Sequence, residues 1–160
     1  MLAPRIIPSL LVHNKGLVKT VKFKDSKYVG DPINAVKIFN EKESDELMVL
    51  DIDATVLNRE PDYKMIENLA TECRMPLCYG GGIKTVEQAT RIFNLGVEKI
   101  ALSSAAIENP QLVSDISKEV GSQSVVVVID VKKKMFGGYD IYTNNGTKKT
   151  NINLEKFIIE

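Results

Sequence analysis

The chain has 160 residues, of which 44% are apolar, and this is enough for a sizeable core in one domain. Its 21 Lys and Arg residues balance its 21 Asp and Glu residues, so no net charge draws the protein to nucleic acid or to an anionic membrane. The first apolar run is too short and too proline-rich for a signal peptide, and no stretch approaches the ~20 apolar residues of a membrane span.

Strand-like apolar runs alternate with amphipathic helical segments along the chain. The first predicted strand is Arg5–Val12, and a long loop, His13–Gly30, follows it. A helix then begins after Asp31, with Pro32 at its first position. The next predicted elements are strand Glu46–Ile52, helix Asp62–Glu72, strand Pro76–Tyr79, a helix with a capping box at Thr85 and Gln88, strand Lys99–Leu102, and a helix from Asn109 to Gly121.

The last part of the chain predicts a fifth strand and a hairpin. Val125–Ile129 contains five apolar β-branched residues without alternation, which is typical of a strand buried on both faces. Asn145-Gly146 lies between two β-prone runs and predicts a β-hairpin turn. A final helix is expected to begin near Asn153 or Leu154.

Five strands separated by four helices indicate right-handed βαβ units, in either a doubly wound open sheet or a TIM barrel. A dinucleotide-binding open sheet would carry G-x-G-x-x-G after its first strand, and this chain does not. Polar and glycine residues instead follow strands two to five, where a TIM barrel places its active site. We therefore predict an α/β fold in which residues 1–160 form the N-terminal part, about five βα units, of a (β/α)8 barrel. Because such barrels take about 250 residues, strands six to eight are expected to be missing.

Two loops of this predicted barrel suit a phosphate group. Gly80, Gly81 and Gly82 follow the third strand, where bare backbone amides can approach an anion, although a tight turn alone would also explain them. Ser103 and Ser104 supply hydroxyl groups on the next loop. Together the two loops predict a phosphorylated small-molecule ligand.

Three aspartates follow buried strands. Asp130 comes directly after the fifth strand, where burial can raise its pKa towards general acid–base catalysis, although a capping or Lys132-paired aspartate is the alternative. Asp51 and Asp53 flank Ile52 at the end of the second predicted strand. One of them could face the site while the other braces a loop.

The loop after the first strand is strongly basic. On the catalytic face of a barrel it is either a solvated loop or a lid over a phosphorylated substrate. His13, the only histidine, lies at its base and is a candidate ligand contact. The loop contains five lysines, namely Lys15, Lys19, Lys22, Lys24 and Lys27.

Charged residues also mark the opposite ends of the strands. Arg5, Glu46 and Lys99 each begin a predicted strand, and Lys99 shares its parity with Ser103. If Ser103 faces the barrel axis, Lys99 does too, and charges of both signs would plug the closed end. Salt-bridged strand ends are the simpler alternative.

The cysteine pattern gives no sign of a metal or a disulfide framework. Cys73 and Cys78 lack any metal-ligand grouping, so we expect core thiols, no cofactor and no metal. Two thiols without a secretion signal favour a reduced, cytoplasmic protein.

Several segments spread over the whole chain match one family pattern. The most specific is Gly121-Ser122-Gln123-Ser124-Val125-Val126-Val127 leading into Asp130-Val131-Lys132. The others are Arg5-Ile6-Ile7, Gly30-Asp31-Pro32, Asp45-Glu46-Leu47, Leu50-Asp51-Ile52, Gly80-Gly81-Gly82-Ile83 and Ala105-Ala106-Ile107-Glu108-Asn109-Pro110. With these segments the chain resembles the cyclase subunit of imidazole glycerol phosphate synthase.

The resemblance implies an ammonia-using barrel. In that family a glutaminase docks on the N-terminal face, and its ammonia passes a charged gate and the barrel axis to a bisphosphorylated ribulosyl-formimino substrate. The implied roles are catalysis for Asp130, binding of one substrate phosphate for Gly82 and Ser104, substrate closure for Lys19, and gating for Arg5, Glu46 and Lys99.

One departure from the family pattern bears on activity. The family's first strand ends Cys-Leu-Asp-Val-Lys, and that aspartate is the catalytic partner of the one after strand five, whereas Leu11 stands at its place here. Losing one member of an acid–base pair typically costs about 10²–10⁴-fold in rate. Ser103 also stands where the cyclases usually carry asparagine.

Three functions fit this pattern. The chain resembles paralogues that accompany a glutaminase and a sugar amidotransferase of surface polysaccharide biosynthesis, in which the barrel relays ammonia, and we favour this interpretation. The alternative is an active cyclase of histidine biosynthesis, in which a group such as His13 replaces the missing aspartate. A sugar-phosphate isomerase on the same barrel is the third, but an isomerase needs no ammonia gate.

Overall fold

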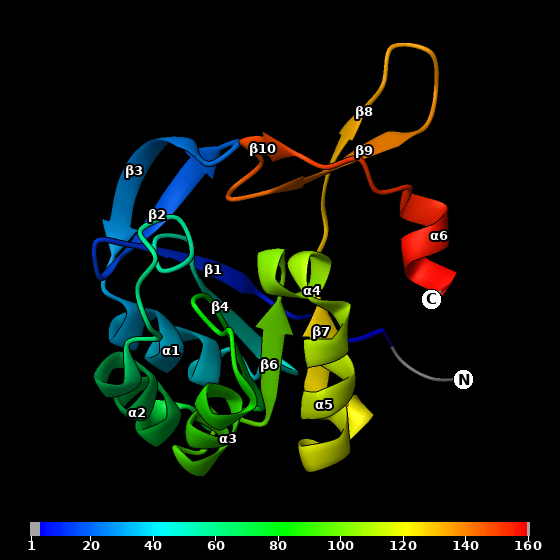
Figure 1. Ribbon diagram of the computed structural model, residues 1–160. Helices are drawn as coiled ribbons and strands as arrows, with labels where there is room; N and C mark the ends of the chain where they lie inside the picture. Colours follow the sequence, from blue (N-terminus) through cyan, green and yellow to red (C-terminus); the bar gives the residue numbers. More distant parts are fainter. Residues whose placement is uncertain (1–3, 160) are drawn as a thin grey trace.

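A seven-stranded sheet forms the body of the molecule in the computed structural model, which describes residues 4–159 (Figure 1). The strand order is β3-β2-β1-β4-β5-β6-β7. The parallel strands are β1 (Ser9–His13), β4 (Leu47–Asp51), β5 (Leu77–Gly80), β6 (Lys99–Leu102) and β7 (Val125–Val127). Their order in space follows their order in the chain, without the reversal that a doubly wound sheet contains. This arrangement confirms the predicted arc of a TIM barrel.

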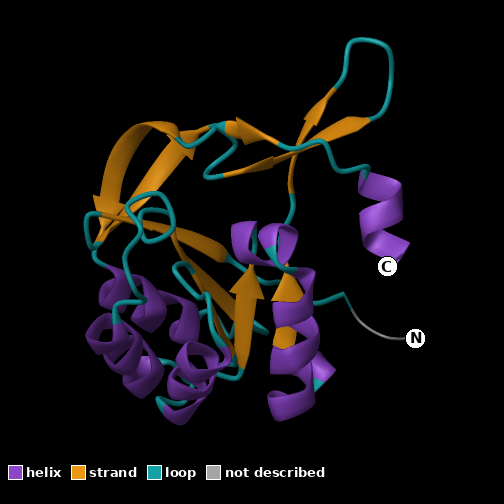
Figure 2. Cartoon of the chain, in the orientation of Figure 1, coloured by secondary structure: helices purple, strands orange, loops and turns teal. Residues whose placement is uncertain are grey.

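Four helices pack on the outer face of this sheet (Figure 2). Three of them begin at capping residues, Asp31 and Thr85 as predicted and also Asp62, whose side chains accept hydrogen bonds from backbone N–H groups of the first turn. The four helices are α1 (Pro32–Glu41), α2 (Tyr63–Glu72), α3 (Val86–Asn94) and α5 (Pro110–Val120).

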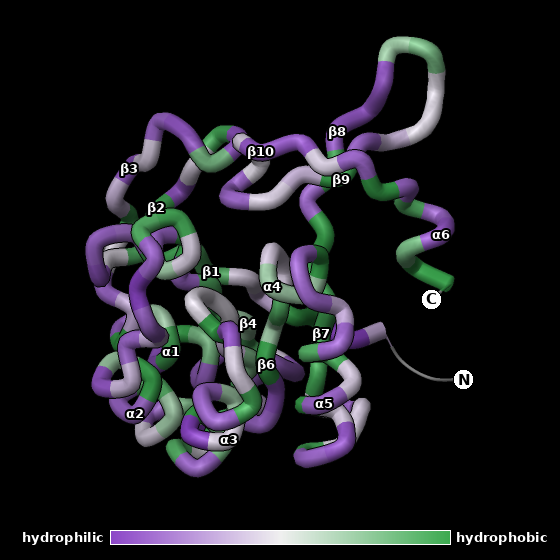
Figure 3. The backbone as a smooth tube through the Cα atoms, in the orientation of Figure 1, coloured by the Kyte–Doolittle hydropathy of each residue, from purple (hydrophilic) through white to green (hydrophobic). Residues whose placement is uncertain are grey.

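The core lies between these helices and the outward residues of the strands. Val12, Val49 and Ile100 are fully buried there against helix residues such as Ile66 and Ile92. The tube in Figure 3 shows this pattern, with apolar strands inside and polar outer helix surfaces. Burial of this one face holds the arc together.

Most of the remaining elements lie beyond the C-terminal ends of the parallel strands. A short helix, α4 (Ser104–Glu108), follows β6. A 3-10 turn, η1 (Ser122–Ser124), lies at the other end of the sheet and leads into β7. A second, antiparallel sheet of β8 (Asp130–Lys133), β9 (Tyr139–Thr143) and β10 (Lys148–Lys149) follows β7, and α6 (Leu154–Ile159) ends the described chain.

The turn between β9 and β10 confirms the predicted hairpin. Lys148 and Lys149 pair with Thr143 and Tyr142, and positive φ angles at Asn144, Asn145 and Gly146 close the turn. Figure 1 shows the β8–β9 hairpin projecting away from the sheet beyond this turn.

Two predicted segments differ in the structure. Residues 13–30 are not a loop: β2 (Gly16–Val21) and β3 (Lys24–Gly30) form a hairpin that extends the sheet beyond β1. Its turn uses positive φ angles at Lys22, Phe23 and Asp25 instead of glycine, so the usual turn signal is missing. The first strand is also shorter than predicted, because regular pairing begins at Ser9 rather than Arg5.

The fifth predicted strand is not buried on both faces. β7 spans three residues, and Val127 is 40% exposed. The reason is its position, because β7 ends the sheet and pairs only with β6 among the described residues. Among residues 4–159, no helix is both long and apolar enough to cross a membrane.

Candidate functional site

The C-terminal ends of the parallel strands meet at a cavity beside Asp130. Four residues predicted to bind phosphate line it together with Asp130, and they come from the loops after β5 and β6: Gly81, Gly82, Ser103 and Ser104. The structure therefore brings this part of the predicted site together.

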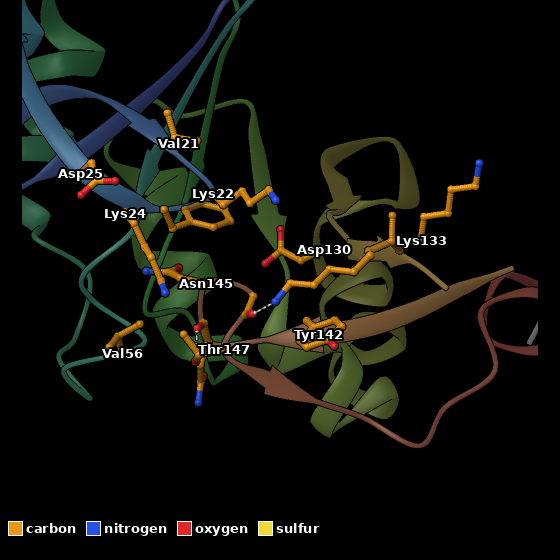
Figure 4. Close-up of a pocket in the computed structure, with 15 residues that line it drawn as sticks. Val21, Lys22, Lys24, Asp25, Val56, Asp130, Lys133, Tyr142, Asn145 and Thr147 are labelled. Carbon is orange, nitrogen blue, oxygen red and sulfur yellow. Dashed lines mark hydrogen bonds between the residues drawn. The ribbon is translucent and has the colours of Figure 1, made fainter. Parts of the chain in front are cut away.

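A larger, open cavity of about 1230 Å³ adjoins the first one. Asp130 and Asn145 line both cavities, and the tip of the β2–β3 hairpin covers one side. Figure 4 shows the Lys22 side chain extending towards the Asp130 carboxylate. Burial raises the pKa of Asp130 above its ordinary value, the direction that suits an acid–base group.

The glycines after β5 allow two loops to approach closely. Gly81 and Gly82 have φ angles of 123° and 74°, and a Cβ at Gly81 would lie 2.4 Å from the backbone oxygen of Asp51. The N–H of Gly82 donates a hydrogen bond to Thr55 Oγ1 at 3.4 Å. Packing against the loop after β4 thus accounts for both glycines, and phosphate binding remains a prediction for them.

The β9–β10 turn connects the loops after β4 and β6. These loops lie at the C-terminal ends of the parallel strands, which form the mouth of the barrel arc. The backbone N–H of Asn144 donates to the buried Ser104 Oγ at 3.0 Å, and Asn145 Nδ2 donates to the carbonyl of Ile52 at 2.7 Å. Sequence reasoning identified this segment only as a turn. Its signal was two asparagines before Gly146, more side-chain hydrogen-bonding capacity than a turn needs.

Lys19 does not line the site. It lies exposed on β2 opposite Lys27, whereas Lys22 and Lys24, at the hairpin tip, line the larger cavity with Asp130. The segment is a hairpin whose side chains alternate between its two faces, and only its tip reaches the cavity. The lysines that line the site are therefore the two at the tip.

His13 is held by an aspartate away from Asp130. Its Nδ1 lies 2.6 Å from Asp53 Oδ1, and the N–H of Asn14 donates to Asp53 Oδ2 at 2.8 Å. Burial opposes ionisation of Asp53, but the hydrogen bonds from Asn14 and His13 and the charge of Arg59 prevail and lower its pKa. These contacts fix the start of the β2–β3 hairpin to the loop after β4.

Asp51 has a different partner set. Its Oδ1 accepts hydrogen bonds from the backbone N–H groups of Asp53 and Ala54 and so caps its own turn. Burial is the largest influence on this carboxyl group and raises its pKa. Asp51 also lines the cavity beside Asp130, whereas Asp53 does not line that cavity and braces loops.

The three predicted gate residues meet at the opposite end of the sheet. Lys99 Nζ donates to Glu46 Oε1 at 2.8 Å and to Oε2 at 2.7 Å, and Arg5 Nη1 lies 3.7 Å from Oε2. The Glu46 side chain is only 3% exposed, whereas that of Arg5 is 63% exposed. The cluster is thus a buried Glu–Lys pair with a peripheral arginine.

Leu11 faces the inner side of the arc. It pairs with Leu50, which pairs with Gly80, and Gly80 pairs with Ala101. The last three of these residues line the cavity beside Asp130, and neighbouring side chains in one register row share a face of the sheet. Leu11 therefore presents an apolar side chain on the face that carries the candidate site.

Both cysteines are free thiols. Burial raises the pKa of Cys78 to about 12, so this thiol is neutral, and the Cys73 Sγ donates to the carbonyl of Met75 at 3.2 Å. Within residues 4–159, no group of three His, Cys, Asp or Glu side chains is arranged to hold a metal ion.

Comparison with known proteins identifies the family. The model of the family described as "Histidine biosynthesis protein" matches residues 5–160. The chain is 63% identical to the "Putative imidazole glycerol phosphate synthase subunit hisF3" of Vibrio vulnificus, over 99% of this chain and 61% of that protein. It is 60% identical to the "Putative imidazole glycerol phosphate synthase subunit HisF" of Leptospira borgpetersenii, over 100% of this chain and 63% of that protein.

A relative from Natranaerobius thermophilus named "Imidazole glycerol phosphate synthase subunit HisF" is 41% identical, again over 100% of this chain and 63% of that protein. The chain thus spans about three-fifths of the length of these relatives. Since the family model covers nearly the whole chain and the barrel arc matches it, the chain belongs to the histidine biosynthesis protein family, in its HisF-type branch.

Proposed function

We propose that the protein containing this chain relays ammonia from a glutaminase, docked at the N-terminal end of the barrel, to the amidation or amidination of a sugar. The sugar belongs to a surface polysaccharide, and the reaction is carried out by a sugar amidotransferase. Imidazole ring formation, the cyclase reaction of histidine biosynthesis, is the competing function.

The observation that carries this proposal is the contrast between the two ends of the arc. At the N-terminal end, the partly buried Lys99 donates two hydrogen bonds to the buried Glu46, an arrangement that suits a closed gate. At the C-terminal end, Leu11 lies on the face of the sheet that carries the candidate site, and a leucine transfers no proton.

His13 offers little compensation for this leucine. Its Nδ1 is held by Asp53, and it lines none of the cavities that contain Asp130. Asp51 lines the same cavity as Asp130, but its Oδ1 already accepts two backbone hydrogen bonds. Leu11 leaves no carboxylate at the position of the family's second catalytic aspartate, whereas passage of ammonia needs none.

Turnover of the ribulosyl-formimino substrate with ammonium salt tests the proposal. We expect the complete wild-type protein to show no more than trace cyclase activity. Leu11→Asp should raise it by about 10²-fold, since it restores one member of an acid–base pair. Leu11→Asn, which is similar in shape but transfers no proton, is the matched control. Substantial wild-type turnover would favour the active cyclase instead.

A further inference from the structure

The tip of the β8–β9 hairpin exposes two large apolar side chains next to each other. Met135 is 90% exposed and Phe136 is 97% exposed, and they contact solvent at the end of a hairpin that projects beyond the sheet (Figure 1). Gly137 and Gly138 complete the tip with positive φ angles and no atom within 4 Å of a Cβ at either position. Adjacent apolar side chains at such an exposed tip are typical of a protein interaction site.

Two ion pairs and a hydrogen bond brace the hairpin below this tip. Asp140 on β9 pairs with Lys134 at 3.2 Å and with Lys149 of β10 at 2.7 Å, and Lys132 Nζ donates to the carbonyl of Gly146 at 2.6 Å. Lys132 also lies over the ring of Tyr142, 3.9 Å from its centre. The tip is therefore presented on a braced arm, which lowers the entropic cost of binding a partner.

The charge on this arm indicates the chemistry of the partner. Residues 130–149 contain five lysines and only two aspartates, although the whole chain is neutral. Lys132, Lys134, Lys148 and Lys149 have intramolecular partners, and exposed Lys133 lies beside the tip. A complementary surface would combine an apolar pocket for Phe136 with carboxylates at its rim.

The base of the same arm forms the mouth of the candidate site. Asp130, Lys132 and Lys133 line the larger cavity, and the β9–β10 turn is tied to the loops after β4 and β6. A protein seated on the tip would thus lie over the end of the barrel at which relayed ammonia emerges. An anionic membrane would be attracted by the same charge, and the vesicle measurement in the test below separates it from a protein partner.

We infer that the Met135–Phe136 tip docks the ammonia-accepting sugar amidotransferase, through an apolar pocket with an acidic rim on that enzyme. This inference rests on the proposed function, since it names the partner that the relay supplies. It places that partner at the end of the barrel opposite the glutaminase.

The test is the affinity of the complete protein for a purified sugar amidotransferase from the same organism. Replacing both tip residues, Met135→Ser with Phe136→Ser, should weaken binding on the order of tenfold or more, as removal of an aromatic anchor does. Phe136→Leu should retain most of the affinity. Ile38→Ser, at an exposed apolar position on α1, is the matched control and should change nothing. Glutaminase binding and glutamine hydrolysis should be the same in all variants.

Three results would overturn the inference. If the wild type binds the amidotransferase and the tip variant binds it equally well, the tip is not the docking site, and the relay proposal still stands. If the wild type does not bind the amidotransferase at all, the proposed function fails together with the inference. If the tip variant loses only its binding to phosphatidylserine-containing vesicles, the tip is a membrane contact.

Discussion

At the scale of single residues, Asp130 decides how much chemistry the mouth can perform. It is half-buried at the first position of β8, and burial is the cause of its raised pKa. The neutral carboxyl form is therefore favoured by folding, and the ionised form carries a desolvation cost.

Because of this desolvation cost, we predict that the contribution of Asp130 to folding stability depends on pH. A raised pKa means that the folded state binds the proton more tightly, so stability is greatest below the ordinary value of 3.8 and falls as pH rises through the folded-state pKa. Asp130→Asn should therefore raise the melting temperature at pH 7, and the gain should vanish below about pH 3. Thermal unfolding of both proteins between pH 3 and 7 measures it. A gain independent of pH would contradict the assignment of burial as the cause.

The positions of some polar residues of the site could be predicted from the order of strands and loops in the sequence, and those of others could not. Asp130, Ser103 and Ser104 follow buried strands, and parallel strands bring their ends to one edge, so their meeting was predictable. Asn145 was not, because its contact with Ile52 joins residues 93 positions apart. Only the fold determines which distant carbonyl an exposed amide reaches.

At the scale of elements, local sequence signals predicted the helices correctly, but the predictions for the strands at the two edges of the sheet were wrong. Asp31, Asp62 and Thr85 cap helices through bonds to residues two or three positions away, and such contacts depend on local sequence alone. The β2–β3 hairpin was missed because its turn contains no glycine, and the burial of β7 was overestimated because burial depends on a neighbouring strand.

The edge at β7 predicts how the 160-residue chain behaves by itself. β7 pairs only with β6 among the described residues, and exposed apolar residues such as Val127 lie along it. Apolar edges pair with other chains, so we expect the isolated polypeptide to be oligomeric or to aggregate. Val127→Lys should reduce this association, since a charge on an edge strand discourages pairing.

Sedimentation velocity measures the self-association of the wild-type 160-residue chain and of its Val127→Lys variant, and denaturant unfolding shows whether each chain is folded. A wild-type chain that is monomeric and unfolds in one cooperative transition would contradict the expectation. An unchanged association in Val127→Lys, with the fold intact, would place the contact elsewhere.

At the scale of the whole molecule, the two ends of the barrel arc carry different kinds of polar group. The N-terminal end holds a tightly paired glutamate and lysine, and the C-terminal end holds a solvated mouth lined by Asp51 and Asp130, whose pKa values are raised by burial. If the glutamate–lysine cluster is only a structural plug, glutamine hydrolysis at one end and product formation at the other need not depend on it. If the barrel relays ammonia, the cluster must couple these two reactions.

Substitution of Lys99 distinguishes a structural plug from an ammonia gate. Lys99→Met keeps the side-chain stem and leaves the buried Glu46 without its main donor, which should cost about 1–3 kcal/mol of stability. If the pair gates ammonia, its loss should also let ammonia escape before it reaches the acceptor. Arg5→Ala is the matched control, because Arg5 is exposed and 3.7 Å from the same carboxylate.

The most direct measurement is the ratio of glutamate released by the bound glutaminase to aminated product formed, in the complete protein and in Lys99→Met. We predict that the ratio rises several-fold in Lys99→Met and little in Arg5→Ala, because partner-bound glutamine hydrolysis continues while glutamine-dependent product falls. Added ammonium salt should restore product formation. A lowered melting temperature with an unchanged ratio would show that the cluster is only a structural plug and would contradict the relay.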